Sequence, residues 1–154
     1  MDLKNPFHTP ATYALVRADY SVLLLLGLGL AGLHWREIHW GWFIVAFAWI
    51  DVVGYLPGAF WYHVRVQGER RRIPPIFHHA YNLAHNVGVN AAVLGIWYLA
   101  AGGWDWTMLA QPIHLCGDRG LFGNLYKPLE LSFEPVMHPS VEKFNLDFQG
   151  EGAW

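Results

Sequence analysis

The sequence predicts an all-α membrane protein that crosses the bilayer with about four helices. Its 154 residues are 54% hydrophobic and only 14% charged, whereas an ordinary soluble domain has about 25% charged residues. Nine Trp and seven Tyr are present, and these amphipathic aromatic residues concentrate where membrane meets water. Long apolar runs separated by short polar segments supply the helices.

The first two spans are expected at residues 20–35 and 40–62. The first contains SVLLLLGLGLAGLHW and is short against the roughly 20 residues needed to cross a bilayer, although the preceding residues could lengthen it. The second contains Pro57 between Gly54 and Gly58. A proline with two nearby glycines predicts a kink near the far end of this span.

The third and fourth spans are expected at residues 80–102 and 106–126. The third begins with polar turns and ends in the apolar run AAVLGIWYLAAG. Residues 1–127 therefore form one transmembrane domain. The proline-containing residues 128–154 are predicted to be a tail that lies at the interface or packs on a surface, with little regular structure.

Basic residues predict the orientation of the spans. The connection between the second and third spans holds Arg65, Arg70, Arg71 and Arg72, whereas Arg36 alone is basic in the connections on the other side. Cytoplasmic connections carry an excess of Lys and Arg. The sequence thus predicts a multi-pass protein with both termini and the Arg-rich connection in the cytoplasm, which four spans allow.

Three short polar clusters interrupt the apolar runs. They are Asp51 with Tyr55, then His78, His79, Asn82 and His85, then His114 with Asp118. Ionisable groups inside a membrane are costly and usually face the protein interior or a ligand. At about 1.5 Å per residue, all three clusters fall in the middle or the cytoplasmic half of the bilayer, where they could face one another.

The spacing of these residues is typical of a metal site. His114 and Asp118 are four residues apart, and His78, Asn82 and His85 share one helical face. The metal ligands expected are Asp51, His85, His114 and Asp118, with His78, Asn82, Tyr55 and Arg119 in supporting positions. Two imidazoles and two carboxylates suit zinc, iron or manganese and could activate a water molecule. Asp51 and Asp118 are also the candidate catalytic carboxylates.

Other interpretations remain open for the same residues. His, Asn and Asp can cross-link membrane helices by hydrogen bonds without any chemistry. The buried histidines could instead ligate a haem or a chlorophyll-type pigment. Arg119 is expected to extend to cytoplasmic water.

Composition excludes several classes of site. Cys116 is the only cysteine, which rules out an intramolecular disulfide and a Cys-rich zinc or iron–sulfur site. The net charge is −2, and no basic patch alternates with aromatic residues, so no nucleic-acid partner is expected.

The polar clusters also resemble a known family. The segments DVVGYLPG (Asp51–Gly58), YNLAH (Tyr81–His85) and HLCGDRGLFGNLYK (His114–Lys127) are similar, in order and spacing, to the DUF4260 family of small bacterial integral membrane proteins. This resemblance implies about four transmembrane helices in a bacterial inner membrane. The pattern more distantly resembles small membrane-bound metal-dependent hydrolases of bacteria, which implies a metal and hydrolysis.

Three functions are therefore compatible with the sequence. The first is a membrane-embedded, metal-dependent hydrolase that acts on an apolar or lipid substrate. The second is a non-catalytic subunit of a larger respiratory or photosynthetic membrane complex. The third is a small transporter or proton relay, although no inverted repeat is visible.

Overall fold

The computed structural model describes residues 10–66, 72–129 and 132–134, together with Ser140, Lys143, Phe144, Leu146 and Asp147. All regular structure in this part of the chain is helical, so the predicted all-α class is confirmed. The helices are α1 (Pro10–Leu33), α2 (Trp40–Gly54), α3 (Leu56–Val64), α4 (Pro75–Ala84), α5 (Val87–Ala101) and α6 (Ala110–Gly117). A 3₁₀ turn, η1 (Trp106–Leu109), precedes α6, and a π-helical turn, η2 (Asp118–Phe122), follows it.

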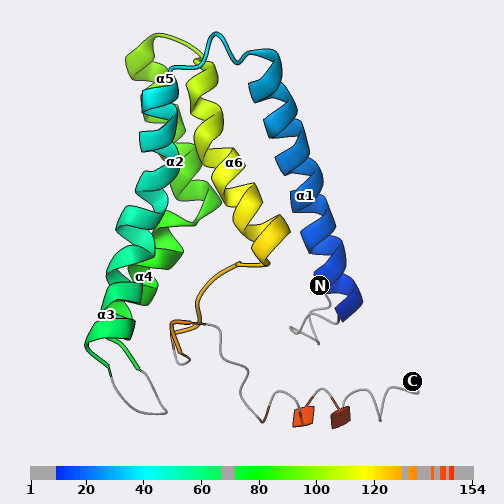
Figure 1. Ribbon diagram of the computed structural model, residues 1–154, viewed down its shortest axis with the longest axis vertical. Helices are drawn as coiled ribbons and strands as arrows, with labels where there is room; N and C mark the ends of the chain where they lie inside the picture. Colours follow the sequence, from blue (N-terminus) through cyan, green and yellow to red (C-terminus); the bar gives the residue numbers. More distant parts are fainter. Residues whose placement is uncertain are drawn as a thin grey trace.

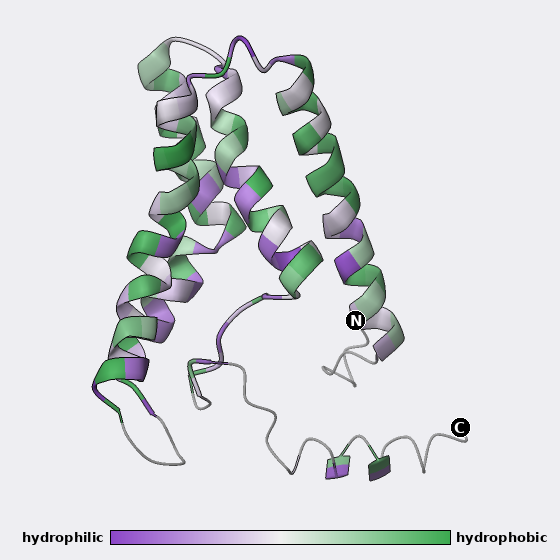
Figure 2. Cartoon of the chain, in the orientation of Figure 1, coloured by the Kyte–Doolittle hydropathy of each residue, from purple (hydrophilic) through white to green (hydrophobic). Residues whose placement is uncertain are grey.

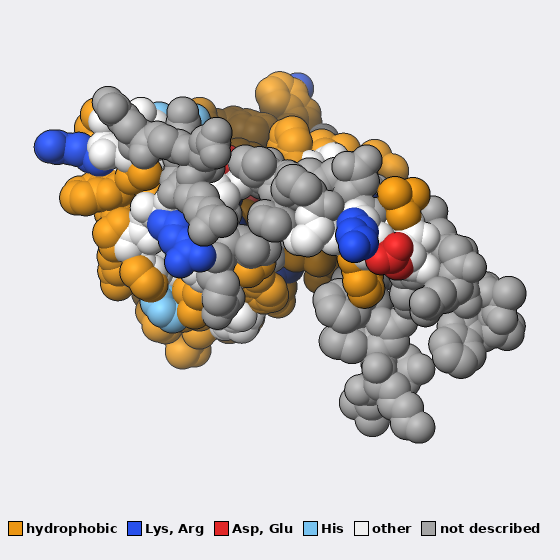
Figure 3. All heavy atoms as spheres, turned by 90° about the horizontal axis from the view of Figure 1, so that it is seen from below, with side chains coloured by type: hydrophobic (Ala, Val, Ile, Leu, Met, Phe, Trp, Pro, Cys, Tyr) orange, Lys and Arg blue, Asp and Glu red, His pale blue; other side chains and the backbone are white. Residues whose placement is uncertain are grey.

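Helix α6 occupies the middle of the bundle (Figure 1). It packs against α1 on one side and α2 on the other, and α2 also packs along α4. The start of α1, the end of α3 and the start of α4 lie at one end, drawn as the lower end in Figure 1. Seen from that end, Lys and Arg side chains are bordered by hydrophobic ones (Figure 3).

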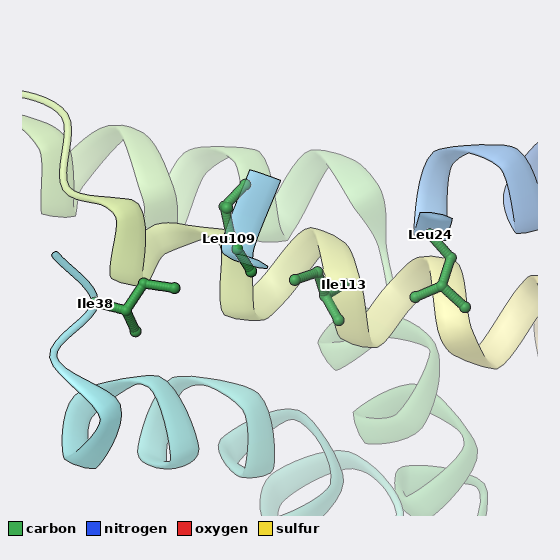
Figure 4. Packing of buried hydrophobic residues seen from close by; sticks show 5 residues of the cluster. Leu24, Ile38, Leu109 and Ile113 are labelled. Atoms are coloured by element: carbon green, nitrogen blue, oxygen red, sulfur yellow. The ribbon is translucent and has the colours of Figure 1, made fainter. Parts of the chain in front are cut away.

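A small apolar core joins α1 to α6. Leu24 of α1, Leu109 of η1 and Ile113 of α6 are buried together with Ile38, and the four side chains lie along α6 in Figure 4. Apolar burial at about 25 cal/mol per Å² stabilises this contact. The core therefore fixes α6 against α1 and sets the position of the residues that follow Ile113.

Hydrophobic residues occur along the length of the helices (Figure 2), and many of them are exposed. Leu25 is 67% exposed, Ile44 is 64% exposed and Leu99 is 78% exposed, on α1, α2 and α5 respectively. A helix that is hydrophobic on every side is typical of a membrane span or of a large core. Helix α1 is long and apolar enough to cross a membrane, and up to three spans result if α2–α3 and α4–α5 each cross as one bent pair.

The second predicted span is bent where the sequence indicated. Helices α2 and α3 meet at Tyr55 with a bend of 43°. Pro57 lies in the first turn of α3, where its missing N–H costs no helical hydrogen bond. The first span differs from its predicted range, because α1 begins at Pro10 and ends at Leu33.

The third predicted span, residues 80–102, is divided between two helices. It begins earlier, at Pro75, and breaks between α4 and α5 with a bend of 55°. Asn86 causes a new helix to start, because its side chain accepts a hydrogen bond from the N–H of Val89 and so caps the first turn of α5. His85 consequently lies at the end of α4 instead of inside a helix.

The fourth predicted segment is divided into η1, α6 and η2. π-helical turns are rare and frequently occur at functional sites. Most of the predicted tail, the first nine residues and the pair Arg70 and Arg71 lie outside the described residues.

Candidate metal centre

Two histidines and two aspartates from separate elements meet inside the bundle. They are Asp51 of α2, His85 at the end of α4, His114 of α6 and Asp118 of η2, and one ligand atom of each lies within 4.8 Å of the others. Nε2 of His85 lies 3.4 Å from Oδ1 of Asp51 and 3.2 Å from Oδ2 of Asp118. Nε2 of His114 lies 3.8 Å and 3.5 Å from the same two oxygen atoms.

Four of the six separations between these atoms are 3.2–3.8 Å and all six lie within 4.8 Å, which is close enough for the four side chains to bind one ion. With metal–ligand bonds of about 2.0–2.1 Å, neighbouring ligand atoms in a tetrahedral zinc site lie about 3.3 Å apart. Two neutral imidazoles and two carboxylates would also cancel the charge of a divalent ion. A net charge of zero for the ion and its ligands is favourable, because an uncompensated charge is very costly in a low-dielectric interior.

The imidazole nitrogens that face the carboxylates lack other partners. Nε2 of His85 and both ring nitrogens of His114 are buried without a hydrogen bond of normal geometry to the described residues. Nδ1 of His85 lies 2.9 Å from the carbonyl oxygen of Tyr81. A carbonyl can only accept, so Nδ1 carries the proton in neutral His85 and Nε2 is free to bind a metal.

Close contact between α2 and α4 holds His85 in place. A Cβ atom added to Gly54 would lie 2.7 Å from Cβ of Ala84 and 3.2 Å from ring atoms of His85. Glycine is therefore required at this crossing. The ring of Tyr81 stacks on the His85 ring with centroids 3.9 Å apart, which fixes the imidazole from its other face.

Arg119 stabilises the break between α4 and α5, next to His85. It is only 4% exposed, and its Nη2 donates to the carbonyl oxygen of His85 over 2.9 Å. Its guanidinium also lies over the rings of Tyr20 and Tyr126. The expectation that Arg119 reaches cytoplasmic water is wrong, because the carbonyl at the end of α4 and the two aromatic faces bind the cation instead.

Replacing Arg119 with glutamine is expected to destabilise the α4–α5 break and to weaken metal binding. A hydrogen bond to a charged group contributes about 1.5–3 kcal/mol, and its loss would free the backbone of His85. Thermal unfolding in detergent, with and without added metal, measures both effects. Arg36, an exposed arginine in the α1–α2 connection, is the matched control, and an equal effect of Arg36→Gln would contradict this role.

Residues 127–129 and 132–134, together called the strap below, pack against α3 and α4 next to the site. The side-chain amide of Asn82 donates to the carbonyl of Lys127 and accepts from its N–H, over 2.9 and 2.8 Å. The Lys127 ammonium donates to the carbonyl of Phe133. It also lies 4.2–5.4 Å from the ring centroids of Phe133, Tyr55 and Tyr81, and burial among them lowers the pKa of Lys127.

Phe133 is the apolar anchor of the strap. It is 1% exposed, and a Cβ atom on Gly58 would collide with its ring. Tyr55 packs against this ring and donates a hydrogen bond to Glu134 over 3.0 Å. Tyr55 and Tyr81, which contact the strap, each lie four residues from a candidate ligand, so the strap packs one helical turn away from the candidate site.

Phe133→Ala is expected to release the strap and to lower the free energy of unfolding. Removing a buried phenylalanine ring costs about 3–5 kcal/mol. Limited proteolysis between residues 127 and 134 should then be faster than in the unsubstituted chain. Phe144, which is 43% exposed, provides the control substitution Phe144→Ala, and equal cleavage rates for both variants would contradict the anchoring role.

The four supporting residues of the sequence prediction lie around the site but are not among the donors that meet. His78 is buried edge-on against Phe133, Asn82 and Tyr55 bind the strap, and Arg119 binds the carbonyl of His85. His78 and His85 were expected on one face of a helix. Because α4 ends at Ala84, the two side chains do not belong to one site.

Sequence reasoning missed Tyr81, Gly54 and the strap as parts of the site. Tyr81 could have been found from its position four residues before His85, where a helical carbonyl lies beneath the imidazole. Nothing in the spacing of the chain indicated that Lys127 and Phe133 return to the bundle.

Comparison with known proteins adds no relative. No family model, no curated protein and no solved structure matches this chain. The fold and the site thus define it only as an all-helical protein with one to three candidate membrane spans and a His/Asp group that could hold a metal ion.

Proposed function

We propose that this chain is an integral membrane enzyme that uses one divalent metal ion to hydrolyse an apolar or lipid-like substrate. The observation that carries the proposal is the convergence of four metal-binding side chains whose imidazole nitrogens face the carboxylates. Zinc, iron or manganese fits this donor set.

The apolar outer surface supports insertion in a bilayer. We infer that α1, the α2–α3 pair and the α4–α5 pair cross it, with η1, α6 and η2 as a fourth, largely buried segment. The basic side chains at the lower end (Figure 3) support a cytoplasmic position for that end by the positive-inside tendency. Both termini would then be cytoplasmic.

The different exposures of the two carboxylates indicate different roles for Asp51 and Asp118. A bound divalent ion supplies an acidified water and polarises a carbonyl or phosphoryl oxygen. The side chain of Asp51 is 43% exposed, whereas that of Asp118 is 17% exposed. We therefore assign Asp51 as the base that accepts a proton, and His85, His114 and Asp118 as the side chains that would hold the ion, which leaves one position of the ion for water.

The surroundings of Asp51 indicate an apolar substrate. Phe47 lies one helical turn before it and is 38% exposed, and Val52 and Val53 beside it are 54% and 51% exposed. Asp51 lies 11 residues after the start of α2, which is about 16 Å along the helix. A substrate that reaches it from the hydrocarbon region would carry an ester or phosphoester bond on an apolar chain.

Pigment binding fits the site less well. The Nε2 atoms of both histidines lie within 3.8 Å of carboxylate oxygens, so no planar macrocycle fits between them. A haem- or chlorophyll-carrying subunit therefore remains an outcome of the test.

The proposal is tested by metal-dependent hydrolysis of amphiphilic esters and phosphoesters by the purified full chain in vesicles. Asp51→Asn is expected to reduce turnover by about 10²–10⁴-fold, the usual contribution of a general base. Asp19→Asn, which alters an exposed aspartate of α1, should leave turnover unchanged. Equal turnover by both variants, or turnover that survives chelation, would refute the proposed reaction.

A further inference from the structure

An open apolar groove lies between α2 and α5, away from the metal centre. It has a volume of about 700 Å³, and its walls include Trp42, Val45 and Trp49 of α2 and Val93 and Trp97 of α5. Ligand pockets typically enclose about 300–1,000 Å³. Asp51 lies two residues beyond Trp49, about 200° around the helix, so the groove and the metal centre are on opposite sides of α2.

One end of the groove lies at the upper end of the bundle. His39 and Asp105 line it there, in the connections that join α1 to α2 and α5 to η1 (Figure 1). The connection between α1 and α2 touches η1, because the His39 N–H donates to the Thr107 hydroxyl over 3.0 Å. The upper end of the bundle carries exposed tryptophans.

Those tryptophans place the polar end of the groove at the level of lipid headgroups. Trp35, Trp40 and Trp104 are 46–55% exposed, and tryptophan concentrates at the membrane–water boundary. From Trp42 to Trp49 the groove descends about 10 Å along α2. Its apolar walls therefore lie at the depth of acyl chains.

Gln111 closes the inner end of the groove. It is 2% exposed, and its amide can accept from the indole N–H of Trp49 over 3.0 Å and donate to the carbonyl of Asn90 over 3.3 Å. These bonds tie α6 to α2 and α5. A ligand in the groove is thus separated from the metal ligands by satisfied side chains.

The charge of the groove lining indicates which kind of lipid headgroup the groove would bind. Asp105 is the acidic group in the lining, and no Lys or Arg lines the groove among the described residues. A carboxylate at headgroup depth attracts an ammonium group and repels a purely anionic one. The Oδ1 atom of Asp105 accepts a hydrogen bond from the N–H of Thr107. The other carboxylate oxygen, Oδ2, is the one that would bind a ligand.

We propose that this groove binds one acyl chain of a membrane phospholipid whose ammonium headgroup, as in phosphatidylethanolamine, meets Asp105. Trp42, Trp49 and Trp97 in the walls of the groove contact the acyl chain, and the Asp105 carboxylate binds the ammonium headgroup. This lipid is a bound component of the protein and is distinct from the substrate of the metal centre.

Native mass spectrometry of the purified full chain in mild detergent tests the proposal. Phosphatidylethanolamine or phosphatidylglycerol is added, and the fraction of protein that retains each lipid is measured. Val93→Phe fills the groove and should abolish retention of phosphatidylethanolamine. Ile44→Phe adds the same ring to an exposed face of α2 outside the groove and should leave retention unchanged.

Asp105→Asn tests the headgroup without filling the groove. Asparagine keeps an acceptor for the Thr107 N–H but removes the charge. The preference for phosphatidylethanolamine over phosphatidylglycerol should fall by about twofold to fivefold, the contribution of a solvent-accessible ion pair. An unchanged preference would overturn the assignment of Asp105.

Two further results would overturn the proposal. One is equal lipid retention by Val93→Phe and Ile44→Phe, and the other is a co-purifying protein that covers the groove. His114→Ala removes a metal ligand and should keep full retention of phosphatidylethanolamine, so failure of the metal proposal and failure of the lipid proposal are distinguishable.

Discussion

Replacement of His114 with alanine is expected to abolish metal binding while the bundle stays folded. His114 contributes one of two imidazoles to the donor group, and its Nε2 has no other hydrogen-bond partner of normal geometry in the described chain. Losing even an outer partner of a ligand costs about 10–100-fold in metal affinity, so losing a ligand should cost more. Metal content after dialysis measures the effect.

The same variant changes how metal affects stability. At a metal concentration about 100 times the Kd, binding stabilises the folded chain by about 2.7 kcal/mol. The unsubstituted chain should therefore unfold at a higher temperature when zinc is added, and His114→Ala should not. His79, an exposed histidine of α4, supplies the control His79→Ala. Metal retention by His114→Ala equal to that of His79→Ala would contradict the site.

Gly54→Ala is the second substitution with a large expected effect, although it adds only a methyl group. The new Cβ would meet Cβ of Ala84 at 2.7 Å and ring atoms of His85 at 3.2 Å. Overpacking of this kind costs about 1–3 kcal/mol. Because the colliding atoms belong to α4 and to a candidate metal ligand, α4 should move away from α2 and the four donors should no longer converge.

Gly95→Ala is the matched control for this substitution. A Cβ atom at Gly95 meets nothing within 4 Å, so the variant should gain stability from the helix propensity of alanine, by up to about 1 kcal/mol. Metal content and unfolding temperature are measured for both variants. If Gly54→Ala retains metal as well as Gly95→Ala does, the close crossing of α2 and α4 does not position His85.

The all-α class and the residues of the donor group could be predicted because both depend on local patterns. Apolar runs identify helices from composition alone, and the spacing of His114 and Asp118 places both on one face of α6 and η2. Asp51 was recognisable because an acid inside an apolar run is costly unless it has a partner. These signals are properties of single segments.

The break at His85 and Asn86 could not be predicted in the same way. A polar turn followed by an apolar run is equally compatible with one straight helix, and the choice depends on the Asn86 cap and on Arg119 binding the carbonyl of His85. Arg119 comes from a segment 34 residues away. Contacts between distant segments decide such positions, and the spacing within one segment does not report them.

The strap illustrates the same limit. Lys127 and Phe133 follow the last helical turn in a proline-containing segment, which favoured a surface tail. Its return to the bundle depends on the paired hydrogen bonds of Asn82 and on the space that Gly58 leaves for the Phe133 ring. Local propensity contains neither of these contacts.

The most direct test of the metal centre is elemental analysis of the full chain purified from its native membrane in mild detergent, with an absorption spectrum of the same sample. The account predicts near-stoichiometric zinc, iron or manganese, with the metal lost in His114→Ala and kept in His79→Ala. Absence of metal even after incubation with each of these ions, or a pigment spectrum in its place, would contradict it.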